Sequence, residues 1–206
     1  MSLPHRPNLP VANGLERVND MREIIVSNYV SLDGFFAGPN GEIDWFMWDE
    51  ETAEYSKGLA ASIDTILFGR VTYELMASYW PTSAAIIDDP IIADLMNGLP
   101  KIVFSRTLQK AEWNNTRLVK DHIAEEITRL KGQPGKDLAI FGSANLLSSL
   151  IQMDLVDEHR IIVNPIVLGK GTPLFQGIIE RLELKLLKTK VFASGNVLLY
   201  YQPEYK

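Results

Sequence analysis

The sequence predicts one α/β domain: a three-layer αβα sandwich on a mixed, mostly parallel sheet, with an antiparallel hairpin at its carboxyl end. From Met21 onward, short apolar runs alternate with stretches of helical periodicity, which is typical of parallel strands joined by helices. Near the end, two strand-like runs follow one another with only "ASGN" at 193–196 between them, and such a turn favours a hairpin. The sheet is therefore expected to be mixed.

The individual elements follow from periodicity and from the residues that end helices. Pro81 closes the helix that begins near Thr72, and Gly132 closes the helix that begins near His122. The expected strands lie at 22–30, 64–69, 101–105, 116–120, 137–142, 158–169, 182–192 and 197–203. The expected helices lie at 48–62, 72–80, 91–99, 122–132 and 144–155.

The composition is that of an ordinary globular protein. The 206 residues are 46% hydrophobic and 22% charged, which is enough for one well-filled core and short for two. The formal net charge is −6 with both signs scattered, which argues against nucleic acid or a membrane surface as partner, because phosphates require a clustered basic face. Cysteine is absent and the three histidines are far apart, so we expect no disulfide and no metal site.

Residues 1–20 differ from the rest of the chain. They contain three prolines and no apolar stretch long enough for a signal peptide, and nowhere does the sequence have an uninterrupted apolar span of membrane length. We therefore expect a flexible N-terminal arm at 1–20, one domain at 21–206 and a cytoplasmic location.

Three of the expected strands end in small or hydroxyl residues, within "ILFGRVT" (66–72), "IVFSRT" (102–107) and "AIFGSAN" (139–145). If these strands are neighbours, Gly69, Ser105 and Gly142 lie together at their carboxyl ends, where open α/β sheets bind ligands. Glycine lets backbone approach a ligand, Thr72 offers an N-cap or first-turn hydroxyl, and a helix N-terminus attracts an anion. Two glycine turns and two arginines would suit several phosphates. Taken singly, each segment is equally compatible with an ordinary strand-to-helix turn.

The usual nucleotide signatures are absent, since no G-x-G-x-x-G follows a strand and "GKGTP" at 169–173 lacks the spacing of a phosphate-binding loop. Five segments in one order instead resemble the reductase domain of bifunctional riboflavin-biosynthesis deaminase-reductases, a family with the dihydrofolate-reductase fold. They are "VSLDGFFAG", "ILFGRVTYE", "VFSRTL", "IFGSANLLSSLI" and "VDEHRIIVNPIVLGKGTPLF". The resemblance covers about 21–203.

The resemblance implies NADPH as cofactor. Gly69, Arg70 and Thr72 would then hold the pyrophosphate at a helix start. Ser105 and Arg106 would hold the 2′-phosphate of the adenosine, where a guanidinium suits a doubly charged group. The next turn would complete the phosphate and nicotinamide contacts through Gly142, Ser143, Ala144 and Asn145.

The resemblance also indicates where a small-molecule substrate would bind. Ser31, Asp33 and Gly34 of "SLDG" would border nicotinamide and substrate, although Asp-Gly is equally a common turn. In the loop that resembles the family, Gly169 and Gly171 would permit a tight turn and Lys170 would reach toward an anionic substrate, the alternative being a surface lysine in a turn.

Two residues of "GEIDWFMWDEE" (41–51) are candidates for a second part of the substrate site. In dihydrofolate reductases a tryptophan precedes the acidic residue that contacts the pterin, and by this similarity Trp45 and Glu50 take those places. Asp33 and Glu50 are thus the candidate catalytic acids. The other acids of this stretch are equally available, and acids early in a helix often serve only the helix dipole. They are Asp44, Asp49 and Glu51.

The function that the resemblance implies is NADPH-dependent hydride transfer to 5-amino-6-(5-phosphoribosylamino)uracil or a related heterocycle or sugar imine. A zinc deaminase half needs cysteines, so that half is not expected here. Reduction of dihydrofolate or another pterin is one alternative, and a nucleotide-binding module without turnover is another.

We also expect a homodimer. The last two expected strands, 182–192 and 197–203, offer more apolar and aromatic surface than a terminal hairpin at a sheet edge can leave in water. The family named above is commonly dimeric. Helices of the same chain could cover this face instead.

Overall fold

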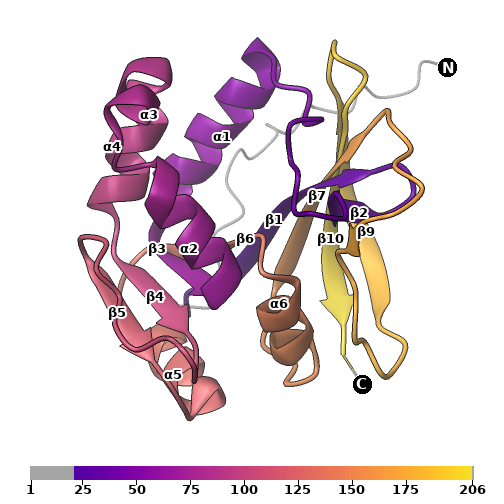
Figure 1. Cartoon of the computed structure of the whole chain (residues 1–206). Helices are drawn as coiled ribbons and strands as arrows, with labels where there is room; N and C mark the ends of the chain where they lie inside the picture. Colours follow the sequence, from indigo (N-terminus) through magenta and orange to yellow (C-terminus); the bar gives the residue numbers. More distant parts are fainter. Residues whose placement is uncertain (1–20, 206) are drawn as a thin grey trace, which may run out of the picture.

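The protein is described by a computed structural model that covers residues 21–205, and the predicted arm at 1–20 lies outside it. Eight strands form one sheet in the order β5-β4-β3-β6-β1-β7-β10-β9 (Figure 1). The strands of this sheet are β1 (Ile24–Ser31), β3 (Ile63–Gly69), β4 (Lys101–Phe104), β5 (Thr116–Val119), β6 (Asp137–Phe141), β7 (Glu158–Asn164), β9 (Glu183–Val191) and β10 (Val197–Glu204).

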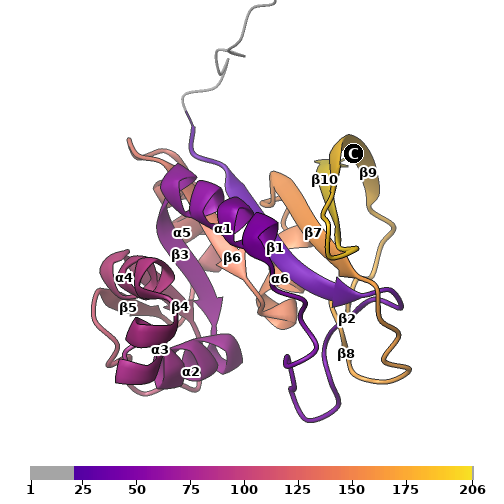
Figure 2. The same ribbon diagram turned by 90° about the horizontal axis from the view of Figure 1, so that it is seen from above.

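The sheet is mixed and mostly parallel, as predicted. The six strands from β5 to β7 pair in parallel, whereas β10 pairs antiparallel with β7 and with β9. The predicted C-terminal hairpin is therefore confirmed. It occupies the edge of the sheet that lies farthest from β5, as Figure 2 shows from above.

Helices cover both faces of the parallel part of the sheet. They are α1 (Glu50–Ser62), α2 (Arg70–Tyr79), α3 (Ser83–Asp88), α4 (Pro90–Gly98), α5 (Ile123–Lys131) and α6 (Ala144–Ile151). Side chains of α5 and α6 pack with Val26, Leu67 and Ile140, whereas α1, α2 and α4 pack with the alternate strand residues Ile25 and Phe68. Because successive strand residues point to opposite faces, the strands contribute side chains to a hydrophobic core on each face of the sheet. The three-layer αβα prediction is therefore confirmed.

Three short elements were not predicted from the sequence. They are helix α3 and the two strands of a small antiparallel ribbon, β2 (Phe35–Ala37) and β8 (Thr172–Pro173). Elements this short contain too few residues to show a hydrophobic period. The ribbon joins the loop after β1 to the loop after β7, which lie more than a hundred residues apart in sequence.

One strand of the sheet carries a fully buried histidine. His159 of β7 is 0% exposed, neither ring nitrogen has a hydrogen-bond partner, and its ring meets Phe175 edge to face with centroids 5.8 Å apart. Burial lowers the pKa of His159 to about 4, because the charged imidazolium would lose its hydration.

This pKa makes stability depend on pH. Unfolded chain takes up a proton at His159 near pH 6.5 and folded protein only near pH 4, so stability is lost as pH falls between these values and is unaffected above them. As pH falls from 6.5 to 4, the free energy of unfolding of the wild type should decrease by on the order of 3 kcal/mol more than that of the His159→Leu variant, which has no imidazole to protonate. Urea titrations at several pH values measure it, and parallel curves for the two proteins would contradict the assignment.

Candidate functional site

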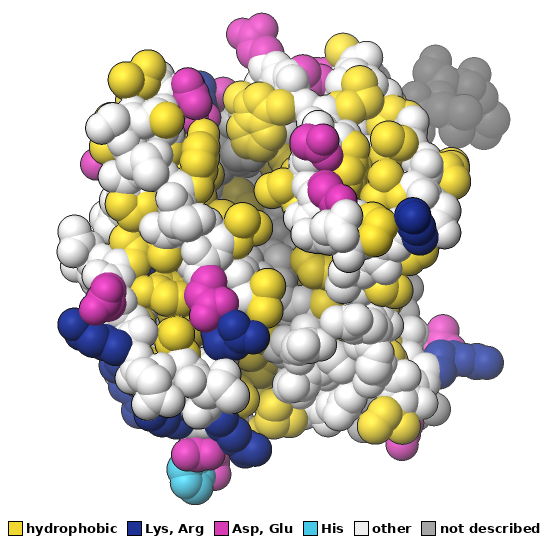
Figure 3. Space-filling model, in the orientation of Figure 1, with side chains coloured by type: hydrophobic (Ala, Val, Ile, Leu, Met, Phe, Trp, Pro, Cys, Tyr) yellow, Lys and Arg dark blue, Asp and Glu magenta, His cyan; other side chains and the backbone are white. Residues whose placement is uncertain are grey.

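A cavity of about 700 Å³ opens at the carboxyl ends of the parallel strands. Figure 3 shows this face hollowed at its centre, with hydrophobic side chains along the hollow. The cavity is walled by β1, by the turns after β3, β4 and β6, by helices α1, α2, α4 and α6, and by part of the loop at 36–48.

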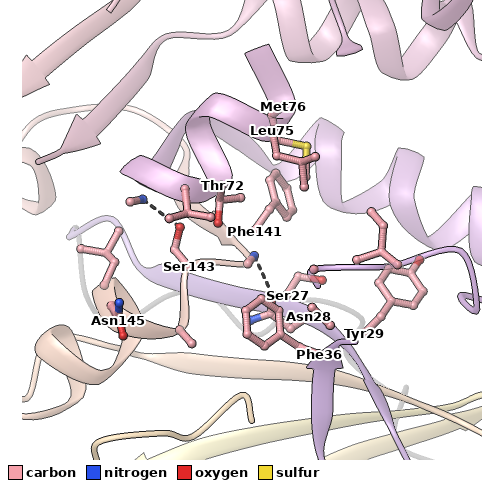
Figure 4. A pocket seen from close by; sticks show the side chains of 18 of the residues that line it. Ser27, Asn28, Tyr29, Phe36, Thr72, Leu75, Met76, Phe141, Ser143 and Asn145 are labelled. Atoms are coloured by element: carbon pink, nitrogen blue, oxygen red, sulfur yellow. Dashed lines mark hydrogen bonds between the residues drawn. The ribbon is translucent and has the colours of Figure 1, made fainter. Parts of the chain in front are cut away.

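The three predicted strand ends do come together. β3 lies between β4 and β6, so Gly69, Ser105 and Gly142 are neighbours along one edge of the sheet, and all three line the cavity. One hydrogen bond ties two of these turns to each other, and a second ties the turn after β6 to β1. The Gly69 N–H donates to Ser143 Oγ at 2.8 Å, and the Gly142 N–H donates to Asn28 Oδ1 of β1 at 2.6 Å (Figure 4).

Two helices begin at this cavity without a side-chain cap. The first-turn N–H groups of α2 and of α6 donate to no capping side chain. The N-cap residue of α2 is Gly69, which has no side chain, and the N-cap residue of α6 is Ser143, whose hydroxyl is already bonded to the Gly69 N–H. By contrast, side chains cap α1, α3 and α4 by accepting from their first turns, namely Asp49, Thr82 and Asp89. Helix α5, which follows β5, also lacks a side-chain cap. Unsatisfied N–H groups and the positive ends of two helix dipoles therefore meet at one point, which favours an anion.

Most of the predicted phosphate-binding residues line this cavity. Arg70 lies at the start of α2, where its guanidinium pairs with Glu74 at 2.7 Å, and Thr72 sits in the first turn rather than at the cap. All four residues predicted in the turn after β6 also line the cavity, namely Gly142, Ser143, Ala144 and Asn145.

Of the two residues predicted to bind the 2′-phosphate, only one lines the cavity. Ser105 lines the cavity, and its Oγ accepts from the Leu108 N–H at 3.0 Å. Arg106 lies beside the cavity without lining it, with its side chain 84% exposed and its Nε 3.3 Å from Asp121.

The predicted substrate residues of two loops form a separate cluster. The Asp33 carboxylate accepts from the Leu168 N–H at 3.1 Å and from the Gly169 N–H at 2.7 Å, which joins the loop after β1 to the loop after β7. Hydrogen bonds from Ser31 and from these amides lower the pKa of Asp33. The structure places this cluster outside the cavity lining, with Ser31, Asp33, Gly34, Gly169 and Lys170 all absent from its walls.

The acidic stretch before α1 is also directed away from the cavity. Glu50 is exposed in the first turn of α1, and the Trp45 indole N–H donates to the Glu42 carbonyl at 3.1 Å. Asp49 caps α1 through Thr52, whose hydrogen bonds lower the pKa of the aspartate to about 2, and Glu51 accepts from the Ala193 N–H at 2.6 Å. Neither Trp45 nor any acid of 44–51 lines the cavity, whereas Phe46 and Trp48 do.

Sequence reasoning missed the polar residues that β1 and α1 bring to the cavity. Ser27 and Asn28 interrupt an apolar strand, and this interruption was the available signal. The Ser27 hydroxyl lies 2.9 Å from the Tyr55 hydroxyl of α1, and burial raises the pKa of Tyr55 to about 12. Asn28 is 4% exposed and its Nδ2 has no hydrogen-bond partner, so a buried donor is left available to a ligand.

The sheet order and the C-terminal hairpin define a dihydrofolate-reductase-like fold, and comparison with solved structures agrees. A putative riboflavin biosynthesis protein from Shewanella sp. PV-4 superposes with a TM-score of 0.72 at 24% identity, covering 89% of this chain and 99% of that one. Dihydrofolate reductase from Enterococcus faecalis, complexed with NADP(H) and RAB-propyl, superposes with a TM-score of 0.60 at 16% identity over 89% and 97%.

The chain belongs to the RibD C-terminal domain family, whose profile matches residues 22–198. It is 38% identical over 180 residues to the uncharacterized protein YyaP of Bacillus subtilis (strain 168), covering 87% of this chain and 94% of YyaP. A Thermotoga maritima diaminohydroxyphosphoribosylaminopyrimidine deaminase/5-amino-6-(5-phosphoribosylamino)uracil reductase superposes with a TM-score of 0.66 at 14% identity, over 89% of this chain and 57% of that one. The suspected family is thereby confirmed.

Over 21–205, no helix is both long enough and apolar enough to cross a bilayer. In the same part of the chain, histidines and carboxylates do not gather in groups of three that could hold a metal ion.

Gly142 is the glycine at which the cavity leaves least room. Its φ is +68°, and a Cβ would lie 3.0 Å from Thr72 Cγ2, whereas Gly169 has a similar φ of +74° with nothing within 4 Å of a Cβ. Both alanine variants should lose about 1–2 kcal/mol of stability from the left-handed backbone, and Gly142→Ala should lose about 1 kcal/mol more from crowding. Urea unfolding compares the two, and equal losses would show that Thr72 gives way freely.

Proposed function

We propose that this chain is an NADPH-dependent reductase that transfers a hydride to a small organic acceptor. One observation carries the proposal: two uncapped helix N-termini and two glycine turns converge at the carboxyl ends of β3 and β6. This arrangement suits the diphosphate of a dinucleotide, because each phosphate finds unpaired N–H groups and a positive helix end. Membership of the RibD C-terminal domain family supports the same reaction class.

The residues present fit such a cofactor. The turn of Gly69, Arg70 and Thr72 is in direct contact with the turn of 142–145, so the diphosphate would lie across the two joined helix starts. At Gly142 a side chain would collide with Thr72, and glycine allows the two turns to pack this closely. Ser105 and Arg106 follow the neighbouring strand and would hold the 2′-phosphate. The unpartnered Asn28 Nδ2 would donate to an acceptor atom of the nicotinamide end.

When bound, NADPH supplies the hydride. The chain itself orients the ring against β1, excludes water with the aromatic walls of the cavity, and fixes the acceptor close by. Catalysis here would come from positioning, since the acids predicted from the sequence do not reach the cavity.

The names of the structural relatives supply two reference acceptors. 5-Amino-6-(5-phosphoribosylamino)uracil follows from the Thermotoga protein, and dihydrofolate follows from the Enterococcus protein. Loss of NADPH absorbance with either compound, or with a panel of small carbonyls and quinones, tests for turnover. Binding of NADPH without oxidation by any acceptor would favour a nucleotide-binding module.

Cofactor choice can be assigned to one arginine. An exposed ion pair such as Arg106–Asp121 is worth little, so Arg106 is free to turn toward a 2′-phosphate. Arg106→Ala should weaken NADPH binding by about 1.5–3 kcal/mol and leave NADH nearly unchanged. Arg70→Ala is the matched comparison, because it should weaken both cofactors alike through the shared diphosphate.

Calorimetric titration of both variants with NADPH and NADH measures these effects. An Arg106→Ala protein that loses equal affinity for the two cofactors would contradict the assignment to the 2′-phosphate. Unchanged binding of both cofactors by Arg70→Ala would contradict the placement of the diphosphate.

We also propose a homodimer formed through the C-terminal hairpin. One face of β9 and β10 carries Leu186, Val191, Leu199 and Tyr201, which the strand register places on the same side. Leu186 is 51% exposed and Val191 is 69% exposed, although both sit in a strand at the edge of the sheet. A twofold partner would cover these side chains.

Light scattering at micromolar concentration tests the dimer. A mass near twice the 23.2 kDa of one chain is expected, and a single-chain mass would refute it. Replacing Val191 with lysine should shift the wild-type dimer toward monomer, because a charge would be buried in an apolar contact. Ile179→Lys is a matched control, since Ile179 is 82% exposed and lies outside the hairpin.

A further inference from the structure

The inner part of the cavity, which we call the acceptor half, differs in chemistry from the phosphate end. Its walls come from β1, α1, α2, α4 and the loop before α1, and they are largely aromatic and aliphatic. Those walls include Phe46, Trp48, Met76, Trp80, Ile92 and Leu95. Such a surface favours flat apolar molecules, because they gain most from leaving water.

Charge is nearly absent from the lining. Among the described residues that line the cavity, Arg70 is the only charged one, and it already pairs with Glu74. Arg70 begins α2 whereas Trp80 follows the end of that helix, so the two are separated by about 15 Å along the axis at 1.5 Å per residue. A charged group in the acceptor half would therefore find no partner of opposite sign.

The charged side chains of the neighbouring loops, which could have paired with a charged substrate, are used elsewhere or lie outside the cavity. Asp33 closes two loops, Asp49 caps α1 and Glu51 holds the turn between β9 and β10. Lys170 is exposed and absent from the lining. Burying an unpaired phosphate or carboxylate against aromatic walls costs far more than an apolar contact returns.

The acceptor half does contain one pair of neutral hydroxyls. Ser27 Oγ and Tyr55 Oη lie 2.9 Å apart, so a single hydrogen bond joins them and one of the two O–H protons remains unshared. Both side chains line the cavity. The unshared proton can be donated to a carbonyl oxygen or an imine nitrogen, and the raised pKa keeps Tyr55 neutral at physiological pH.

We infer that the acceptor is an uncharged, planar, largely apolar molecule with a polarised double bond, such as a quinone or a conjugated ketone, held at its heteroatom by Ser27 and Tyr55. This inference rests on the proposed hydride transfer from NADPH. In the step, a C–H bond of the dihydronicotinamide ring would break, and its hydrogen would carry the bonding pair to the electrophilic carbon. A new C–H bond forms there as the π pair of the double bond moves to the heteroatom. The heteroatom takes up a proton, supplied by solvent through the hydroxyl pair, and NADP⁺ remains.

A matched pair of acceptors tests the charge requirement. 1,4-Naphthoquinone and its 2-sulfonate share one ring system and differ by one sulfonate group, which adds a single negative charge. After subtraction of the uncatalysed rate, kcat/KM should favour the uncharged quinone by on the order of 100-fold. The kcat/KM for the uncharged quinone should also exceed the kcat/KM values for 5-amino-6-(5-phosphoribosylamino)uracil and dihydrofolate. Equal or better turnover of the anionic compounds would overturn the inference.

A pair of tyrosine variants tests the hydroxyls. Tyr55→Phe should lower kcat/KM for the uncharged quinone by about tenfold and leave the NADPH dissociation constant within about twofold, because only the acceptor loses a hydrogen bond. Ser27→Ala should act in the same direction. Tyr79→Phe removes an exposed hydroxyl outside the cavity and should change neither quantity. Full activity of both Tyr55→Phe and Ser27→Ala would overturn the role of the pair.

Calorimetric titration of the wild type with NADPH separates this inference from the proposed function. Failure to bind NADPH would refute the proposed function itself. Binding of NADPH together with preferred reduction of the phosphorylated or carboxylated acceptors would refute only the substrate class. A protein that binds NADPH and reduces no uncharged acceptor would overturn the inference as well.

Discussion

Two hydrogen bonds between side chains and backbone hold the candidate site together. Ser143 accepts from the Gly69 N–H and Asn28 accepts from the Gly142 N–H, so the carboxyl ends of β3, β6 and β1 are joined into one edge. Losing either acceptor would leave a partly buried N–H without a partner, at a cost of up to about 1–3 kcal/mol. Because Ser143 is used in this way, α6 begins uncapped, and the bond that stabilises the edge also leaves donors free for a ligand.

The acidic side chains near the cavity are likewise used in hydrogen bonds to the backbone. Asp33, Asp49 and Glu51 accept backbone hydrogen bonds from residues more than a hundred positions away or cap a helix. They connect the loops around the cavity and leave its lining neutral apart from Arg70. The fold of a reductase can therefore keep its cofactor end and present a different surface to the acceptor, since a fold alone does not determine what is reduced.

The sequence was sufficient for the architecture and for one half of the site. Strand and helix periods are local, and the rule that ligands bind at the carboxyl ends of parallel strands placed Gly69, Ser105 and Gly142 together. The sequence could not show that Asp33 would be satisfied by Gly169, because that contact depends on how two distant loops meet. Nor could it show that Tyr55 would face Ser27, since a tyrosine on an amphipathic helix is compatible with core or surface.

The central claim is that a nicotinamide dinucleotide binds with its diphosphate across the adjoining starts of α2 and α6. A crystal structure of the protein with NADP⁺ tests this most directly. We expect the diphosphate within hydrogen-bond distance of first-turn N–H groups of both helices, and the nicotinamide ring beside Ser27 and Asn28. A diphosphate bound elsewhere, or a nicotinamide ring lying in the cluster of Asp33 and Gly169, would contradict the account.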